Sequence, residues 1–141
     1  MFEGSIARSY EAISRKDLDA VMSSWADDGV FEFPGHTPIS GRHEGKEGVR
    51  AFFKQIFDGL ESTRFTVRHA AMANPIGLTW SNVMYVEWTV ADTTHDGVTV
   101  LLDGISAFRF RAGKVVYVRD YFFDTTALDA LWARSAVPVG A

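Results

Sequence analysis

The stretch FRFRAGKVVYVRDYF, from Phe108 to Phe122, decides the fold. Its two arms alternate apolar and polar residues, with the period of two that a half-buried β-strand shows. Ala112-Gly113 stands between the arms, and glycine suits a tight turn. The stretch therefore predicts a β-hairpin with strands over residues 98–110 and 114–123.

Strand signals continue upstream of this hairpin. Residues 65–69 and 83–90 have strand patterns, with a turn at Asn74-Pro75-Ile76-Gly77 between them. His95-Asp96-Gly97 supplies the next turn, because Asp-Gly accepts positive φ. Four long strands joined by tight turns predict an antiparallel sheet that is covered on one face.

The first half of the chain has helical periodicity. A first helix carries one apolar stripe, made of Phe2, Ile6, Tyr10 and Ile13. Asp17 is expected to cap a second helix that ends at Asp27-Asp28-Gly29. The apolar face of that second helix would consist of Leu18, Val21, Met22 and Trp25.

The segments that follow complete the pattern. Residues 30–33 predict a short strand stopped by Pro34-Gly35, and residues 41–45 a polar loop. A third helix would bury Val49, Phe52, Phe53, Ile56 and Leu60, and a short closing helix Leu128, Leu131 and Trp132. We therefore predict one α+β domain over residues 1–136, with a loose tail over 137–141.

Composition narrows the function classes. The chain has 141 residues, of which 47% are hydrophobic and none is cysteine, so a disulfide scaffold, a thiolate zinc site and a cysteine nucleophile are excluded. A net charge of −4 gives no electrostatic reason to bind nucleic acid or an anionic membrane. No apolar run approaches the roughly 20 residues that cross a bilayer, and the N-terminus lacks a secretory pattern. We expect a cytoplasmic protein.

Asp120 is the anomaly of the last strand. Val116, Val118, Asp120 and Phe122 share one strand face, which is otherwise apolar and should point inward. A buried carboxylate is costly unless it is paired, or else its pKa rises. Asp120 is therefore either a structural acid, in a salt bridge to an arginine or in a hydrogen-bonded capping role near the sheet rim, or a general acid/base in a dry pocket.

Several strings resemble the nuclear transport factor 2-like superfamily. At the start these are Arg8 to Ile13, Asp17 to Ala20 and Trp25 to Phe33, followed by Ile39-Ser40-Gly41-Arg42. At the end, Phe108-Arg109-Phe110, Gly113 to Val116 and Arg119 to Phe122 resemble the last hairpin of SnoaL-like polyketide cyclases and limonene epoxide hydrolases. The resemblance implies a cone-shaped curved sheet, an α+β barrel whose N-terminal helices close a pocket. It also implies a homodimer formed through the outer sheet face, which would carry Tyr85, Tyr117, Arg119 and Tyr121.

Two related mechanisms do not transfer to this sequence. The general base of the ketosteroid isomerases falls on Phe33 and their second oxyanion acid near Ser106, although Tyr10 matches their oxyanion-hole tyrosine. In the epoxide hydrolases only the last-strand aspartate matches, at Asp120. Their arginine and second aspartate fall on Trp88 and Val90.

The resemblance to SnoaL-like cyclases implies one acid/base, Asp120, in an apolar cavity. Tyr10 would be the second catalytic group, with Tyr10 or Ser106 binding the oxygen that gains charge. The implied substrate-binding residues are Phe31, Phe33, Trp88, Val90, Leu102, Ser106, Val118 and Phe122, together with Trp25 and His36.

The remaining histidines carry weaker signals. His36 and His43 flank the loop before the third helix, near the expected pocket mouth, while His69 falls within a strand and His95 in a turn. Their spacing matches no common zinc motif, and the sequence has no glycine-rich phosphate loop. We therefore expect no metal and no cofactor.

Three functions remain open from the sequence. The first is a cofactor-independent cyclase, isomerase or dehydratase acting on a small polyketide-like or terpenoid-like ring, favoured by an unpaired Asp120 in an aromatic pocket. The second is a non-catalytic ligand-binding or dimerisation domain, favoured by an arginine paired with Asp120. The third is an altered water-adding hydrolase, favoured if a bulge turns Glu87 inward.

Overall fold

The computed structural model describes residues 2–74 and 81–135. The elements follow the chain in this order: α1 (Phe2–Ser14), α2 (Leu18–Met22), β1 (Trp25–Phe33), β2 (Gly41–Glu44), α3 (Gly45–Gly59), β3 (Ser62–Met72), β4 (Ser81–Thr93), β5 (Thr99–Arg111), β6 (Lys114–Phe122) and α4 (Thr125–Ser135). The predicted tail over 137–141, and Pro75 to Gly77 of the predicted turn, lie outside the described residues.

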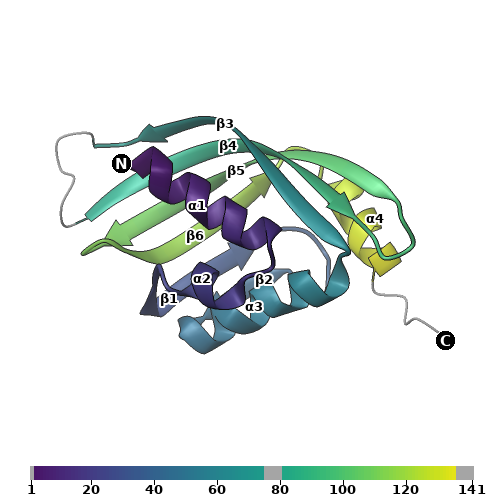
Figure 1. The fold of residues 1–141 in the computed structure, drawn as a ribbon, viewed down its shortest axis with the longest axis horizontal. Coiled ribbons are helices and arrows are strands. Elements are labelled where there is room, and N and C mark those ends of the chain that lie inside the picture. The colour runs from purple at the N-terminus through teal and green to yellow at the C-terminus, as the bar shows by residue number, and fades with distance from the viewer. Residues whose placement is uncertain (1, 75–80, 136–141) are drawn as a thin grey trace.

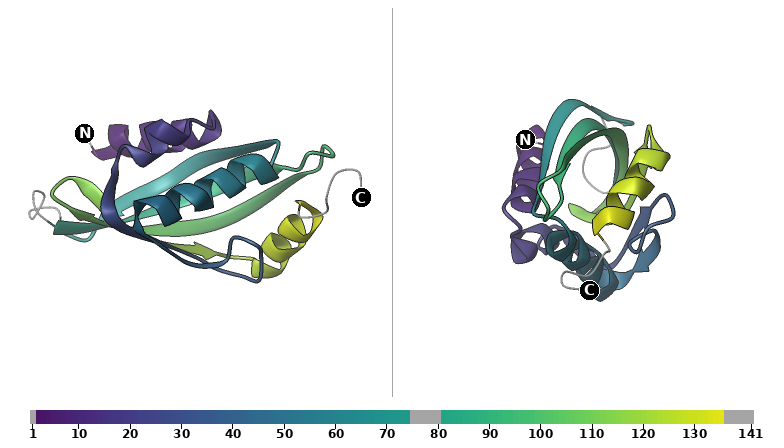
Figure 2. Two further views of the ribbon diagram at one scale, coloured as in Figure 1. Left: turned by 90° about the horizontal axis from the view of Figure 1, so that it is seen from below. Right: turned by 90° about the vertical axis from the view of Figure 1, so that its right-hand side faces the viewer.

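The described strands form one curved sheet in the order β2-β1-β6-β5-β4-β3 (Figure 1). The end-on view of Figure 2 shows the sheet arched, with the helices gathered around its concave side. This confirms the predicted α+β class with a curved sheet. One pairing differs from expectation, because β1 runs parallel to β6. Most of the chain separates these two strands, so no tight turn forces them to be antiparallel.

The second helix is shorter than predicted. Asp17 caps it as expected, accepting a hydrogen bond from the Ala20 amide at 3.1 Å. The helix ends at Met22 because the hydroxyls of Ser23 and Ser24 donate to carbonyl groups of the preceding turn. Trp25 therefore begins β1 rather than lying on the helix, and Asp27-Asp28-Gly29 belongs to that strand.

Two further segments differ from the sequence prediction. Residues 41–44 of the expected polar loop form β2, which pairs with β1. In the last hairpin the register shifts so that Arg109 faces Tyr117 while Phe110 faces Val115. This bulge at Val116 turns Val115 inward, where it is buried, and leaves Val116 half-buried, which reverses the predicted faces of these two residues.

The long strand β4 shows the predicted alternation. Met84, Val86, Trp88 and Val90 are buried on its inner face, whereas Tyr85 and Glu87 are exposed on the outer one. The inner face, α1 and α3 share one hydrophobic core. The inner residues of β5 and β6 line the same cavity as residues of α1 and α3.

None of the helices in the described part of the chain combines the length and apolar character that crossing a bilayer requires.

Candidate active site

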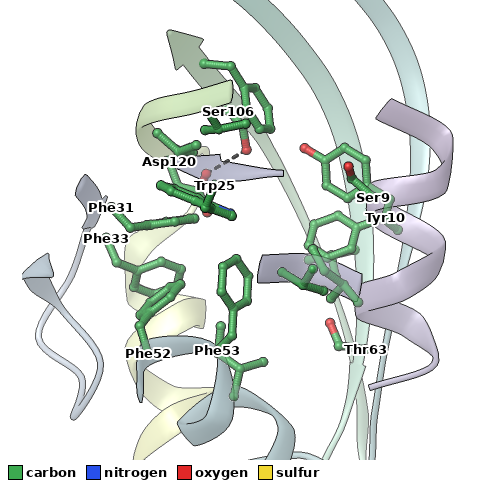
Figure 3. Close-up of a pocket in the computed structure, with 18 of the residues that line it drawn as sticks. Ser9, Tyr10, Trp25, Phe31, Phe33, Phe52, Phe53, Thr63, Ser106 and Asp120 are labelled. Atoms are coloured by element: carbon green, nitrogen blue, oxygen red, sulfur yellow. Dashed lines mark hydrogen bonds between the residues drawn. The ribbon is translucent and has the colours of Figure 1, made fainter. Parts of the chain in front are cut away.

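A cavity of about 210 Å³ lies between the concave face of the sheet and helices α1 and α3 (Figure 3). Its walls are mainly aromatic, from Trp25, Phe31 and Phe33 of β1 and Phe52 and Phe53 of α3. These rings contact one another; the centroids of Phe31 and Phe52 are 4.3 Å apart. Such walls favour an apolar, flat ligand.

Asp120 lies on the wall that the sheet forms, opposite Ser106 of the neighbouring strand. The Ser106 hydroxyl donates to Asp120 Oδ1 at 2.6 Å, and Trp88 Nε1 donates to Ser106 Oγ at 2.9 Å. An indole N–H can only donate, so it fixes Ser106 as its acceptor and directs the serine hydrogen to the carboxylate. The three side chains form one directed chain of hydrogen bonds.

The electrostatics of Asp120 follow from its burial. Only 8% of the residue is exposed, and burial raises its pKa to about 7, although the Ser106 hydrogen bond acts in the lowering direction. Among the residues that the structure describes, no basic side chain forms an ion pair with it. A carboxyl group of this kind is divided about equally between its acid and base forms at neutral pH.

Tyr10 of α1 faces this pair from the other side of the cavity (Figure 3). Its ring packs against Phe65 at 4.7 Å, and within residues 2–74 and 81–135 its buried hydroxyl has no hydrogen-bond partner. Burial raises the pKa of Tyr10 well above its ordinary value, so the hydroxyl stays protonated and can donate. Ser106 has already committed its hydrogen to Asp120, whereas the hydrogen of the Tyr10 hydroxyl has no acceptor among the described residues.

The cavity brings most of the predicted lining residues together. Those that line it are Trp25, Phe31, Phe33, Val90, Ser106, Val118 and Phe122. Trp88 and Leu102 are buried but do not line it. The indole of Trp88 is held edge-on against Phe65 and Phe122, behind the cavity wall. Leu102 precedes Gly104, which is the first residue of β5 that pairs with β6. Leu102 therefore lies outside the part of the sheet in which β5 and β6 are paired.

The histidines lie away from the cavity. His36 is exposed, and its backbone amide donates to Asp129 Oδ1 at 2.7 Å, so it joins β1 to α4 rather than meeting a ligand. His43 Nε2 donates to the Ile39 carbonyl at 2.7 Å. His69 is exposed because a register shift after Val67 turns it outward, 3.9 Å from Glu87. The described residues contain no group of acids and histidines that could hold a metal ion.

The cavity wall holds a second buried acid, Asp92, which was not predicted from the sequence. Asp92 has the same strand parity as Val90 and lies near Thr63 of β3. The predicted strand stopped at Val90, whereas β4 continues to Thr93. If the alternation of inward and outward residues in this strand is extended by two residues beyond Val90, it places Asp92 on the inner face.

Comparisons with known proteins agree with this architecture. The sequence model of the SnoaL-like domain family matches residues 6–118. Bal32a, from a soil-derived mobile gene cassette, is 20% identical with a TM-score of 0.79, covering 92% of this chain and 95% of that one. An NTF2-like protein of unknown function from Burkholderia pseudomallei is 23% identical with a TM-score of 0.78, covering 92% and 95%.

TerC, crystallised with polyporic acid, is 22% identical with a TM-score of 0.76 and covers 92% of this chain and 96% of its own. No match was found among curated proteins. Because these solved structures have low sequence identity to this chain, they show only the shared fold. The match to the family model shows which family the chain belongs to. The chain belongs to the SnoaL-like domain family.

Proposed function

We propose that the protein is a cofactor-independent acid/base enzyme, of the cyclase, isomerase or dehydratase type, that acts on a small apolar ring substrate. The observation that carries this proposal is Asp120, a buried carboxyl group without an ion pair in an aromatic cavity, oriented by Ser106. An acid held in a structural salt bridge would have a cationic partner.

The geometry supports proton transfer. Asp120 in its ionised form removes a proton from a carbon next to a carbonyl group, and Tyr10 donates a hydrogen bond to the oxygen that gains charge. Asp120 then returns the proton, to the new alkoxide in a ring closure or to another carbon in an isomerisation. The same carboxyl group removes the proton and gives it back, so this chemistry requires no second base.

The size of the cavity bears on the substrate. A cavity of roughly 150 Å³ holds benzene, so a volume of about 210 Å³ suits one substituted ring better than a large polycycle. The structure of TerC, co-crystallised with polyporic acid, supports a small-molecule ligand in this fold. The lining includes no Lys, Arg or His among the described residues, which disfavours an anionic substrate.

The altered water-adding hydrolase receives no support from the geometry. That function requires a second acid beside Asp120, and Glu87 was the candidate. Glu87 lies exposed on the outer face of β4, near His69.

The first test is the titration of Asp120. Carboxyl-labelled NMR, with Asp120→Asn to assign the signal, should show a pKa near 7, as its burial dictates. A value below about 4 would mean that the carboxylate is paired in solution, and the acid/base proposal would then give way to a non-catalytic binding domain.

The second test is turnover. A panel of monocyclic and bicyclic ketones is screened for isomerisation, ring closure and exchange of the α-hydrogen with deuterated water. Asp120→Asn should lower kcat by about 10²–10⁴-fold, and Tyr10→Phe by about 10²-fold. The exposed Asp103→Asn on β5 is the matched control and should leave kcat unchanged. Equal activity in wild type and Asp120→Asn would refute the role of Asp120.

A further inference from the structure

Asp92 is a second buried carboxyl group that the proposed mechanism does not use. It is 6% exposed and lines the cavity, and its Oδ1 has no hydrogen-bond partner among the residues that the structure describes. Burial raises its pKa to about 6, with the neighbouring Thr63 hydroxyl acting in the lowering direction. A buried polar atom without a partner is unfavourable, so a native structure that retains one calls for an explanation.

Asn82, on the same inner face of β4, is a buried polar residue with a structural role, and its hydrogen bonds can be compared with those of Asp92. Its side-chain amide donates to the Asn74 carbonyl at 2.6 Å, and its carbonyl accepts from the amides of Asn74 and Val83. Asn82 is buried and bonded at both ends, and it holds the strand end together. Asp92 has the same burial without this set of partners.

Asp92 is also separate from the Asp120 site. Asp92 pairs with Val100 across β4 and β5, whereas Asp120 pairs with Ser106. The distance along β5 from Val100 to Ser106 is roughly 20 Å at the usual strand rise. The two carboxyl groups therefore do not share one proton, and they form two distinct polar points on the wall of the cavity.

We propose that Asp92, with Thr63 beside it, binds a hydrogen-bond donor of the ligand, an alcohol or a protonated amine, remote from the carbon that reacts at Asp120. No Lys, Arg or His lines the cavity in the described part of the chain, so the free oxygen of Asp92 is left for the ligand. The donor would satisfy that oxygen and orient the ring along the aromatic walls. This inference rests on the proposed function in taking the cavity as the ligand site.

Three probes with one carbon skeleton test the inference: ethylbenzene, 2-phenylethanol and protonated 2-phenylethylamine. Binding is followed by NMR, using labelled aspartate carboxyl groups and the Val methyl groups of the cavity. The alcohol, the amine or both should bind at least about tenfold more tightly than ethylbenzene and shift the Asp92 carboxyl signal.

Two substitutions separate the two kinds of donor. Asp92→Leu replaces the unpaired acid with an apolar group. It should abolish the tighter binding of the alcohol and the amine, and it should leave the affinity for ethylbenzene within about twofold of the wild-type value. Asp92→Asn keeps an acceptor oxygen and removes the charge, so it should weaken the amine more than the alcohol. Asp120→Asn is the matched control and should preserve the gain.

The inference is overturned if no probe shifts the Asp92 signal, if all three probes bind equally, or if the gain disappears only in Asp120→Asn. The two proposals can fail separately. Donor selectivity at Asp92 together with an Asp120 pKa below about 4 would refute the enzyme and keep this site. If the pKa of Asp120 is near 7 but the probes show no preference for a hydrogen-bond donor, the enzyme proposal is kept and the Asp92 site is refuted.

Discussion

Ser106 links the core to the protonation of Asp120, and its removal has two expected effects. Ser106→Ala deletes the hydrogen bond that lowers the pKa of Asp120, so that pKa should rise further and the basic form should appear at higher pH. The change also leaves Trp88 Nε1 without its acceptor, which should lower the free energy of unfolding by about 1–3 kcal/mol. Carboxyl NMR and urea unfolding measure the two effects.

Trp88→Phe provides the control for Ser106→Ala. It removes the indole donor and keeps an aromatic side chain and the Ser106 to Asp120 hydrogen bond. It should therefore destabilise the fold while moving the Asp120 pKa much less than Ser106→Ala does. If both variants shifted that pKa equally, the direct serine hydrogen bond would not be what sets it.

At the residue scale, strand parity was enough to place Asp120 on the inner face, because alternation holds wherever the ladder is regular. It failed for Val115 and Val116, where a bulge inserts one residue, and for Asp92, where the strand was ended too early. The partner of Asp120 could not be predicted, since Ser106 meets it only through the register of β5 and β6.

At the element scale, the backbone of Gly104 in β5 lies close against the indole ring of Trp88. A Cβ atom there would lie 2.5 Å from Trp88 Cη2 and 2.6 Å from the Tyr121 carbonyl oxygen. Gly104→Ala should therefore displace Trp88 or the strand and destabilise the protein by about 1–3 kcal/mol. Urea unfolding measures the change, together with the Asp120 titration, because Trp88 supports Ser106.

Gly48→Ala in α3 is the opposite case. Its Cβ would lie 3.6 Å from the nearest atom, which is an ordinary contact. Alanine favours a helix over glycine by up to about 1 kcal/mol, so this variant should be as stable as wild type or more stable. A loss of stability equal to that of Gly104→Ala would show that the steric argument is wrong.

The elements also show what periodicity cannot predict. The existence of α1, α3 and the four long strands followed from pattern, but the end of α2 depended on serine side chains that compete for its last carbonyl groups. The parallel pairing of β1 with β6 is a contact between distant segments, and no local signal encodes it.

At the scale of the whole molecule, we propose that two copies pair through the outer sheet face. Tyr85 and Tyr121 are 49% and 50% exposed there, and Ile105, which pairs with Tyr121, is 39% exposed. An apolar patch of this kind favours a partner. Sedimentation should show a dimer that Ile105→Glu converts to a monomer, whereas Gln55→Glu, on the exposed side of α3, should not. A monomeric wild type would exclude this pairing.

The two buried acids also set how the stability of the whole fold depends on pH. Burial raises the pKa of Asp120 to about 7 and that of Asp92 to about 6, from an ordinary value of 3.8. Between 3.8 and these values the folded state binds protons that the unfolded chain has released, so stability falls as pH rises. The contribution is complete below pH 3.8 and is lost by about pH 7. Exposed carboxylates such as Asp28, whose pKa is lowered by its hydrogen bond from Arg111, act in the opposite direction and only at more acidic pH.

Urea unfolding at pH 5 and pH 8 tests this dependence on the wild type and on a variant that combines Asp92→Asn and Asp120→Asn. The wild type should lose on the order of 4 kcal/mol relative to the variant between the two pH values, because ionising each acid inside the cavity is unfavourable. The single variants should divide this loss, with Asp120 acting at higher pH than Asp92. Parallel pH profiles in all four proteins would mean that both carboxyl groups are hydrated in solution, and the cavity would then not be the dry site that acid/base chemistry at Asp120 requires.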